Sequence, residues 1–154
     1  MVIEESVNLP AKKLMTPNVV SVGPDATLKE VSELMDKQKI GSVVVIDNDK
    51  AVGIVTERDF ATKIMIKSYL PDTKVSAVMS SPVIYVVPNQ SVADIIDIMA
   101  NKEIRKIPVI DNGKVVGIIS GTEFLRLFFR ATDDDMKKAY QQYVKRIFSN
   151  WFED

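Results

Sequence analysis

The chain has 154 residues, of which 46% are hydrophobic and 27% are charged, and its formal net charge is -1 at pH 7. This is the composition of a folded globular protein, and the charge balance lacks the basic excess typical of nucleic-acid-binding domains. Cysteine and histidine are both absent, which excludes Cys/His zinc sites, thiol nucleophiles, histidine general bases and disulfide scaffolds.

The N-terminal sequence has no apolar segment of the kind found in signal peptides. No apolar run approaches the roughly 20 residues that a membrane helix needs. We therefore expect a cytoplasmic protein that has neither a membrane nor a nucleic acid as its partner.

An internal duplication organises the sequence. Residues Met15–Phe60 align without a gap with Met79–Phe124, and about one third of the aligned positions are identical. The first copy begins with an apolar run at Val19–Val22 that predicts a strand. Thr27 followed by Glu30 is then the signature of a capped helix start.

The two copies continue in the same way. "SVVVIDNDKAVGIV" and "KIPVIDNGKVVGII" are each two β-rich runs around a polar turn, and Asn112-Gly113 is a strong hairpin signal. A second helix is predicted to open at Thr56 in the first copy and at Ser120 in the second. The second copy also has an apolar run, Val83–Val87, at the position of the first strand.

Each copy is thus predicted to be a β-α-β-β-α unit, which makes the fold α/β, or α+β. A small sheet cannot bury its exposed face alone, so we expect the two pseudo-symmetric units to pack sheet to sheet. The predicted domains are residues 10–70 and 71–130, followed by a helical tail at 131–154.

The tail reads as an amphipathic helix capped by Thr132. Its role is open among packing on its own domain, packing on a second subunit and docking to another protein. The apolar stripe predicted for it is Met136, Tyr140, Tyr143, Ile147, Phe148, Trp151 and Phe152.

One short phrase recurs at the start of the second helix of each copy, as "GIVTERDF" and then as "GIISGTEF". In a purely structural interpretation, Thr56 with Asp59, and Ser120 with Glu123, are capping boxes. In a functional interpretation, the hydroxyl and the acid bind a nucleoside phosphate, because a carboxylate can accept hydrogen bonds from a ribose diol. Glutamate extends about 1.5 Å further than aspartate, so the two sites are expected to be unequal.

The order of elements and the motifs "LMTPNVVSVGPDATLKEVSELM…IGSVVVIDNDKAVGIVTERDF" and "VMSSPVIYVVPNQSVADIIDIM…IRKIPVIDNGKVVGIISGTEF" resemble a tandem pair of cystathionine-β-synthase (CBS) domains, often called a Bateman module. The resemblance covers roughly residues 10 to 130. It implies that adenosine-containing ligands, such as AMP, ADP, ATP or S-adenosylmethionine, bind in the cleft between the two repeats. The first copy matches the family motif fully, whereas the second has Glu123 in place of aspartate.

The resemblance also implies two sets of binding residues, each shared between the repeats. The set expected to be stronger, because it has an aspartate and two cations, is Thr56, Arg58, Asp59, Ile84, Tyr85, Ile104, Arg105, Lys106 and Pro108. The set expected to be weaker is Thr16, Val19, Val20, Ile40, Gly41, Ser42, Ser120 and Glu123.

Two functions compete on this evidence. The first is a stand-alone regulatory module that senses an adenosine ligand and passes occupancy to an unidentified effector protein, as a homodimer that needs no cofactor. The alternative is a structural homodimerisation or assembly module that binds no small molecule. We expect no enzyme, because the sequence shows neither a nucleophile elbow nor a glycine-rich phosphate loop.

Overall fold

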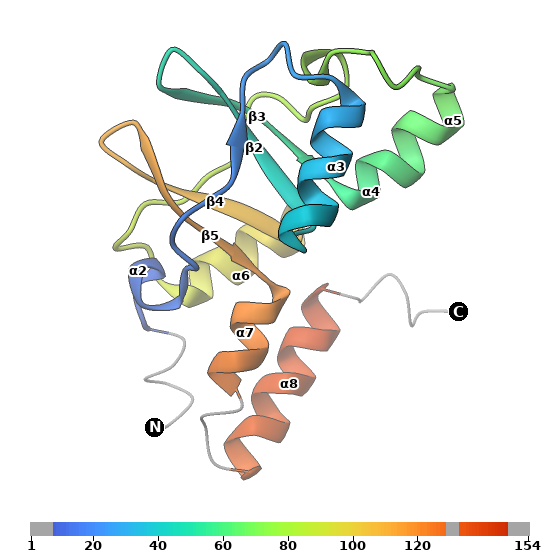
Figure 1. Cartoon of the computed structure of the whole chain (residues 1–154). Coiled ribbons are helices and arrows are strands. Elements are labelled where there is room, and N and C mark those ends of the chain that lie inside the picture. The colour runs from blue at the N-terminus through green and yellow to red at the C-terminus, as the bar shows by residue number, and fades with distance from the viewer. Residues whose placement is uncertain (1–7, 129–132, 148–154) are drawn as a thin grey trace. The chain divides into compact units, whose positions relative to one another are not determined.

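The computed structural model describes residues 8–128 and 133–147. The chain divides into two compact units. The N-unit holds residues 18–84 and 112–115, and the C-unit holds the described parts of 1–17, 85–111 and 116–154. Figure 1 labels most of the helices and strands of both units.

The N-unit contains a three-stranded sheet in the order β1-β2-β3, in which β1 is parallel and β3 antiparallel to β2. One helix connects β1 to β2, and the other helical elements follow β3. The bounds are β1 (Ser21–Val22), α3 (Leu28–Gln38), β2 (Ser42–Asp47), β3 (Lys50–Thr56), α4 (Glu57–Asp59), the π-helical turn η1 (Phe60–Ile64), α5 (Met65–Lys67) and the 3-10 turn η2 (Val75–Ala77).

The capping box predicted for α3 is present. The Thr27 hydroxyl accepts from the Glu30 backbone N–H at 3.2 Å, and the Glu30 carboxylate accepts from the Thr27 N–H at 2.7 Å. The helix ends where Lys39 turns to a left-handed conformation. Val31 and Met35 lie one turn apart on the buried face of α3, which packs this helix into the N-unit core.

The C-unit repeats this plan and adds helices at both of its ends. Its bounds are α2 (Ala11–Leu14), α6 (Val92–Asn101), β4 (Lys106–Asp111), β5 (Lys114–Ser120), α7 (Gly121–Phe128) and α8 (Asp133–Ile147), and β4 pairs with β5, whose first two residues are counted with the N-unit. The mixed α/β class is as predicted, and the elements follow the predicted order, except that the first strand is shorter than predicted in the N-unit and is reduced to a single bridge in the C-unit.

The strand predicted at Val83–Val87 is wrong in its extent. Only Val86 forms a bridge, which is parallel to Val109 and uses hydrogen bonds of 3.0 and 2.9 Å. Pro82 and Pro88 flank the run, and proline removes the backbone donors that a longer ladder would need.

Both hairpins close with two-residue loops in which both residues have positive φ. The values are 46° and 63° for Asn48 and Asp49, and 48° and 80° for Asn112 and Gly113. Loops of this kind match the twist of antiparallel strands, and asparagine, aspartate and glycine adopt the conformation at the lowest cost. The hairpin predictions are confirmed.

Each unit also takes in the segment that precedes the other unit's repeat in the chain. Residues 10–16 pair with the second repeat, and residues 74–80 pair with the first repeat at the aligned positions. The antiparallel bridges are Pro10–Ser91 and Thr16–Ile118 in the C-unit, and Lys74–Thr27 and Ser80–Ile54 in the N-unit.

These segments explain the glycine of the repeated phrase. A Cβ added at Gly53 would lie 2.3 Å from Met79 Sδ, and one added at Gly117 would lie 2.4 Å from Met15 Sδ. Both values are far inside van der Waals contact, so glycine is needed for close approach of the methionine from the preceding segment. The two pairs occupy the same aligned positions in the two repeats.

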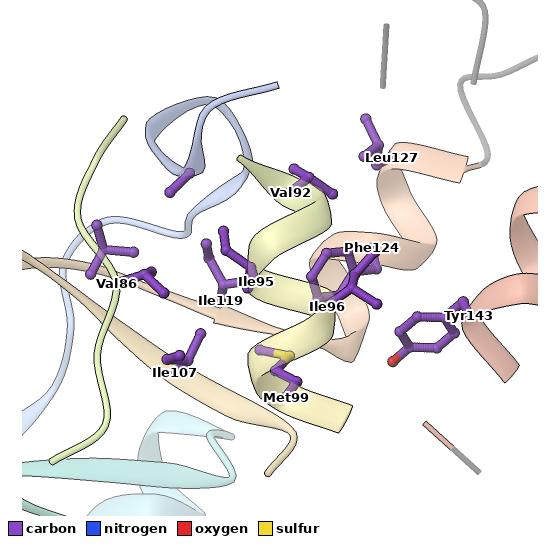
Figure 2. Close-up of a cluster of buried hydrophobic side chains, with 12 residues drawn as sticks. Val86, Val92, Ile95, Ile96, Met99, Ile107, Ile119, Phe124, Leu127 and Tyr143 are labelled. Atoms are coloured by element: carbon purple, nitrogen blue, oxygen red, sulfur yellow. The ribbon is translucent and has the colours of Figure 1, made fainter. Parts of the chain in front are cut away.

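Helix α8 packs on α6 and α7 of its own chain. Tyr143 is 9% exposed and joins the C-unit core drawn in Figure 2, where its ring lies 5.6 Å from that of Phe124 at an interplanar angle of 38°. Burial raises the pKa of Tyr143, and the positive charge of Arg105 offsets part of this effect. Packing on its own domain is therefore the role that the structure supports for α8.

The apolar stripe predicted for the tail needs one correction. Tyr140 is 52% exposed, whereas Val144 packs against the core. Tyr140 lies one turn before Tyr143 and Val144 on the same face of α8, so the helical pitch alone does not predict its exposure. The expected cap Thr132 and the aromatic residues Phe148, Trp151 and Phe152 lie outside the described residues, as do the side chains of Met136 and Ile147.

Candidate functional site

The first motif lies where β3 ends and α4 begins. Asp59 is 7% exposed, and its Oδ2 atom accepts hydrogen bonds from the Thr56 backbone N–H at 2.8 Å and from the Thr56 hydroxyl at 3.0 Å. The acid thus reaches back to the cap, as the structural interpretation predicts. The capping box is present, and the Thr56 hydroxyl also donates to the acid.

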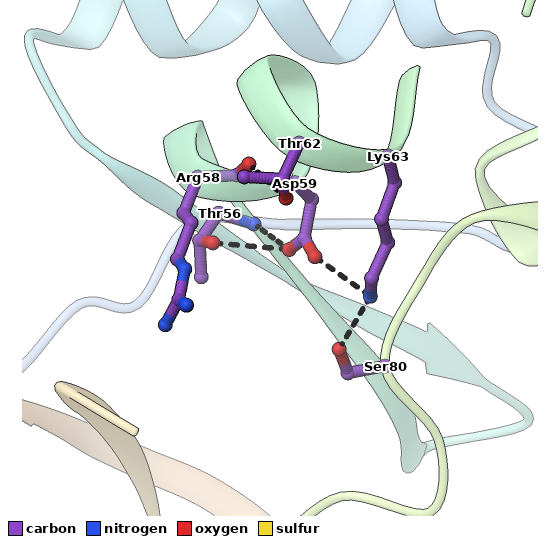
Figure 3. Close-up of polar contacts among 6 residues, drawn as sticks. All are labelled: Thr56, Arg58, Asp59, Thr62, Lys63 and Ser80. Carbon is purple, nitrogen blue, oxygen red and sulfur yellow. Dashed lines mark hydrogen bonds and ion pairs between the residues drawn. The ribbon is translucent and has the colours of Figure 1, made fainter. Parts of the chain in front are cut away.

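The second oxygen of this carboxylate is bound by a lysine that sequence reasoning missed. Lys63 Nζ lies 2.7 Å from Asp59 Oδ1 and donates to Ser80 Oγ at 3.0 Å. Figure 3 shows the lysine reaching down from its helix between the two partners, while Arg58 extends to the other side of Thr56. The aspartate is therefore connected to the segment that precedes the second repeat.

The second motif lies where β5 ends and α7 begins. The Ser120 backbone N–H donates to Glu123 Oε2 at 2.7 Å, and the Ser120 hydroxyl donates to the same oxygen. The Thr16 hydroxyl donates to Glu123 Oε1 at 2.8 Å. Three predicted residues, Thr16, Ser120 and Glu123, are thus brought together.

Burial and hydrogen bonding act in opposite directions on Glu123. Burial raises the pKa of Glu123, but the hydrogen bonds from the Ser120 side chain, the Thr16 hydroxyl and the backbone outweigh it, so that the pKa lies below its usual value of 4.5. Arg126 adds only a distant partner, at 3.9 Å from Glu123 Oε1. The carboxylate is ionised at neutral pH.

The change of acid between the repeats now has a structural explanation. Thr16 and Ser80 are aligned positions, and each carries a hydroxyl facing the acid of its own unit. Glutamate is longer by about 1.5 Å and reaches Thr16 directly. Aspartate falls short of Ser80, and Lys63 bridges the gap.

The other predicted residues of the N-unit lie around the same strand ends. Ser42 pairs with Thr56 in the sheet, and the carbonyl of Gly41 accepts from the Glu57 backbone N–H at 3.1 Å. Ile84 is 36% exposed. Val19, Val20 and Ile40 also belong to this unit.

The predicted residues of the C-unit lie at β4 and beside it. Lys106 begins β4, and the carbonyl of Pro108 accepts from the Val86 backbone N–H at 3.0 Å. Tyr85 is 52% exposed, next to the buried Val86. Ile104 and Arg105 directly precede the strand.

Each of the two predicted sets is divided between the units. Thr56, Arg58, Asp59 and Ile84 belong to the N-unit, whereas Tyr85, Ile104, Arg105, Lys106 and Pro108 belong to the C-unit. The roles of these residues in ligand binding stay predictions. The sequence did contain signals for the two missed residues, since Lys63 stands one helical turn after Asp59 and Ser80 aligns with Thr16.

Neither a metal site nor a membrane-spanning helix is found in the part of the chain that the structure describes. Within residues 8–128 and 133–147, no group of three or more acidic side chains is placed to hold a metal ion. None of the helices in this part of the chain is long and apolar enough to span a bilayer.

The geometry agrees with comparisons to known proteins. The CBS domain family model matches residues 11–66 and 75–130. The CBS domain-containing protein YhcV of Bacillus subtilis is 33% identical over 109 residues, which cover 71% of this chain and 78% of YhcV.

Solved structures give the same result. An uncharacterised conserved protein from Pyrococcus horikoshii has a TM-score of 0.77 at 28% identity, covering 82% of this chain and 97% of that one. The CBS domain pair of protein MJ0100, solved with 5-methylthioadenosine and S-adenosyl-L-methionine, has a TM-score of 0.73 at 23% identity, covering 79% and 97%. Two matches to the family model, over the two copies of one repeat, show that this chain belongs to the CBS domain family as a tandem pair.

Proposed function

We propose that this chain is a regulatory module that binds an adenosine-containing ligand, such as AMP, ADP, ATP or S-adenosylmethionine, and passes its occupancy to a partner protein. The observation that carries the proposal is the pair of motif carboxylates, each held at a strand end by a hydroxyl residue. The ligands of the MJ0100 domain pair support the adenosine class. The proposal assigns the chain no catalytic step.

Asp59 is the better candidate for the ribose. Its Oδ1 partner is Lys63, whose side chain is 39% exposed, so the ammonium group can move into solvent while the carboxylate, which is 10% exposed, stays in place. Glu123 instead binds Thr16, whose backbone pairs with Ile118 through two hydrogen bonds of 2.9 Å. A ligand that took Glu123 would have to displace a hydroxyl fixed at a paired backbone position, whereas one that took Asp59 would displace the head group of a long, flexible lysine.

The phosphate of such a ligand needs positive charge. By the family resemblance, we assign this role to Arg105 and Lys106, with Arg58 adding to it. The remaining members of the two predicted sets are proposed to contact the base and the sugar.

Calorimetric titration of the wild-type protein with the four ligands tests the proposal. We expect at least one to bind, and Asp59→Asn to weaken that binding at least tenfold, because a ribose hydroxyl would lose its charged acceptor. The matched control is Asp25→Asn, which makes the same chemical change at a side chain that is 81% exposed. Failure of all four ligands to bind a well-folded protein would overturn the proposal.

One observation favours assembly as a second function. Met65, Ile66 and Leu70, on α5 and just beyond it, are 74%, 77% and 66% exposed. Large apolar side chains gathered on one surface are typical of association sites, so we propose that the chain forms a homodimer. Sedimentation analysis of Ile66→Lys tests this, and an unchanged sedimentation coefficient that corresponds to a dimer would exclude this surface from the interface.

A further inference from the structure

The second inference concerns Lys63 and rests on the proposed role of Asp59 in ribose binding. Lys63 lies one helical turn beyond Asp59, and its ammonium group contacts both Asp59 Oδ1, at 2.7 Å, and Ser80 Oγ, at 3.0 Å (Figure 3). Lys63 therefore contacts Oδ1, the carboxylate oxygen that accepts no hydrogen bond from Thr56.

The hydrogen-bonding capacity of the Asp59 carboxylate determines whether both hydroxyls of a ribose can donate to it. A carboxylate has about four acceptor positions. Thr56 fills both positions of Oδ2, through its backbone N–H and its hydroxyl, and Lys63 fills one position of Oδ1. One position is left, whereas a vicinal diol presents two hydroxyl donors.

The aligned position in the second repeat shows that this lysine is not required by the fold. Leu127 stands there, is 7% exposed and belongs to the C-unit core. In that repeat the acid is bound by the Thr16 hydroxyl, and its cation partner, Arg126, lies 3.9 Å from the same oxygen. A cation at hydrogen-bonding distance from the acid is thus a feature of the first motif.

We propose that Lys63 is a displaceable latch on the ribose position of Asp59. Without a ligand it occupies Oδ1 and ties Asp59 to Ser80. When both hydroxyls of a ribose bind Asp59, the ammonium group leaves Oδ1 and releases the Ser80 side chain.

The surroundings of Lys63 allow this movement. The Lys63 side chain is 39% exposed, so its head group has solvent to move into. Ser80 stays in place when the lysine leaves, because its backbone exchanges two hydrogen bonds with Ile54, at 2.9 and 3.1 Å. Ser80 then loses only the hydrogen bond that its Oγ accepts from Lys63. Ser80 lies four residues before Ile84, a member of the set of binding residues predicted to be stronger.

The latch makes a prediction about selectivity for the diol. A nucleotide with one ribose hydroxyl fits the free acceptor position while Lys63 stays, whereas one with both hydroxyls must displace it. Removing the lysine therefore strengthens the binding of AMP relative to 2′-deoxy-AMP. AMP and 2′-deoxy-AMP carry the same phosphate, so the ratio of their dissociation constants cancels any effect of the lysine charge on phosphate binding.

The experiment measures dissociation constants for AMP and 2′-deoxy-AMP by calorimetry. In Lys63→Met we expect the ratio of the deoxy to the ribo constant to rise about two- to fivefold above wild type, which is the effect of losing one ion pair whose cation is partly exposed. Lys63→Arg keeps the cation and should leave the ratio at the wild-type value or below it. Lys67→Met, the matched control, removes the same charge from an exposed position one turn further on and should leave the ratio unchanged.

The outcomes separate this inference from the function on which it rests. If Lys63→Met weakens both nucleotides alike, or leaves the ratio unchanged, Lys63 is a ligand contact or a bystander and the latch is overturned, while the proposed function stands. If the wild-type protein binds neither nucleotide, the latch is overturned, and the proposed function is overturned with it only if ADP, ATP and S-adenosylmethionine also fail to bind.

Discussion

Shortening Glu123 to aspartate tests the account of why the two repeats carry different acids. Asp59 shows within the same chain that an aspartate keeps both hydrogen bonds to its cap residue. In Glu123→Asp the bonds to Ser120 should therefore persist. The distance to the Thr16 hydroxyl should grow from 2.8 Å to about 4 Å, beyond hydrogen-bonding range.

The cost follows from the kind of bond that is lost. A hydrogen bond to a charged group contributes about 1.5–3 kcal/mol. Thr16 is exposed, so water replaces part of the interaction, and we expect the lower end, about 1.5 kcal/mol. Urea denaturation followed by circular dichroism measures the change in the free energy of unfolding.

A double-mutant cycle with Thr16→Val completes the test. Thr16→Val removes the same bond from the other side, so the double variant should be little less stable than either single variant, with a coupling energy of about 1 kcal/mol or more. Thr122→Val, which removes an exposed hydroxyl from the same helical turn, should change stability by less than about 0.5 kcal/mol. Strictly additive costs would refute the direct role of glutamate length.

Three further predictions concern packing and pH. Gly53→Ala should cost about 1–3 kcal/mol of stability by overpacking, and should cost less in a Met79→Ala background; equal costs would show that Met79 is not the obstacle. Because the pKa of Glu123 is lowered by folding, its ionised form adds stability that is fully present above pH 4.5 and is lost as the pH falls through the lower folded-state value. Wild type and Glu123→Gln should therefore differ in unfolding free energy at pH 7 and converge in strong acid, and a constant gap would contradict the assignment. Tyr143→Ala should lower the free energy of unfolding, measured by urea denaturation, by about 3 kcal/mol. Tyr140→Ala, at a 52% exposed position, should lower it by less than about 0.5 kcal/mol. Similar losses for the two variants would contradict the packing of α8.

Local chemistry made much of the fold predictable. The alternation of apolar residues and the loop pairs Asn48-Asp49 and Asn112-Gly113 determine the hairpins, because few residues adopt positive φ at low cost. Thr27 and Glu30 mark a helix start by satisfying free backbone donors. These signals act over a few residues, so a single sequence displays them.

Long-range pairing was not predictable in this way. Nothing in the local pattern around Thr16 or Ser80 indicates the strand each will meet, because a bridge across many residues depends on the whole fold. The pattern at Val83–Val87 overstated the strand for a similar reason, since the partner and the flanking prolines limit it to Val86.

The candidate site was predictable in its motif and not in its contacts. The residues Thr56 and Asp59 followed from the repeated phrase. The Lys63 bridge did not, because a lysine one turn after an acid is ordinary on an exposed helix and becomes meaningful only when Ser80 is placed opposite. Placing Ser80 required the same long-range pairing.

The central claim is that Asp59 accepts hydrogen bonds from the ribose of an adenosine ligand. Its most direct test follows the carbon-13 resonance of the Asp59 side-chain carboxyl during titration with AMP and, separately, with S-adenosylmethionine, with Glu123 observed in the same spectra. The account predicts a saturable shift at Asp59 with at least one of them and a smaller change at Glu123. Saturable binding seen elsewhere in the spectrum with an unmoved Asp59 resonance would contradict it.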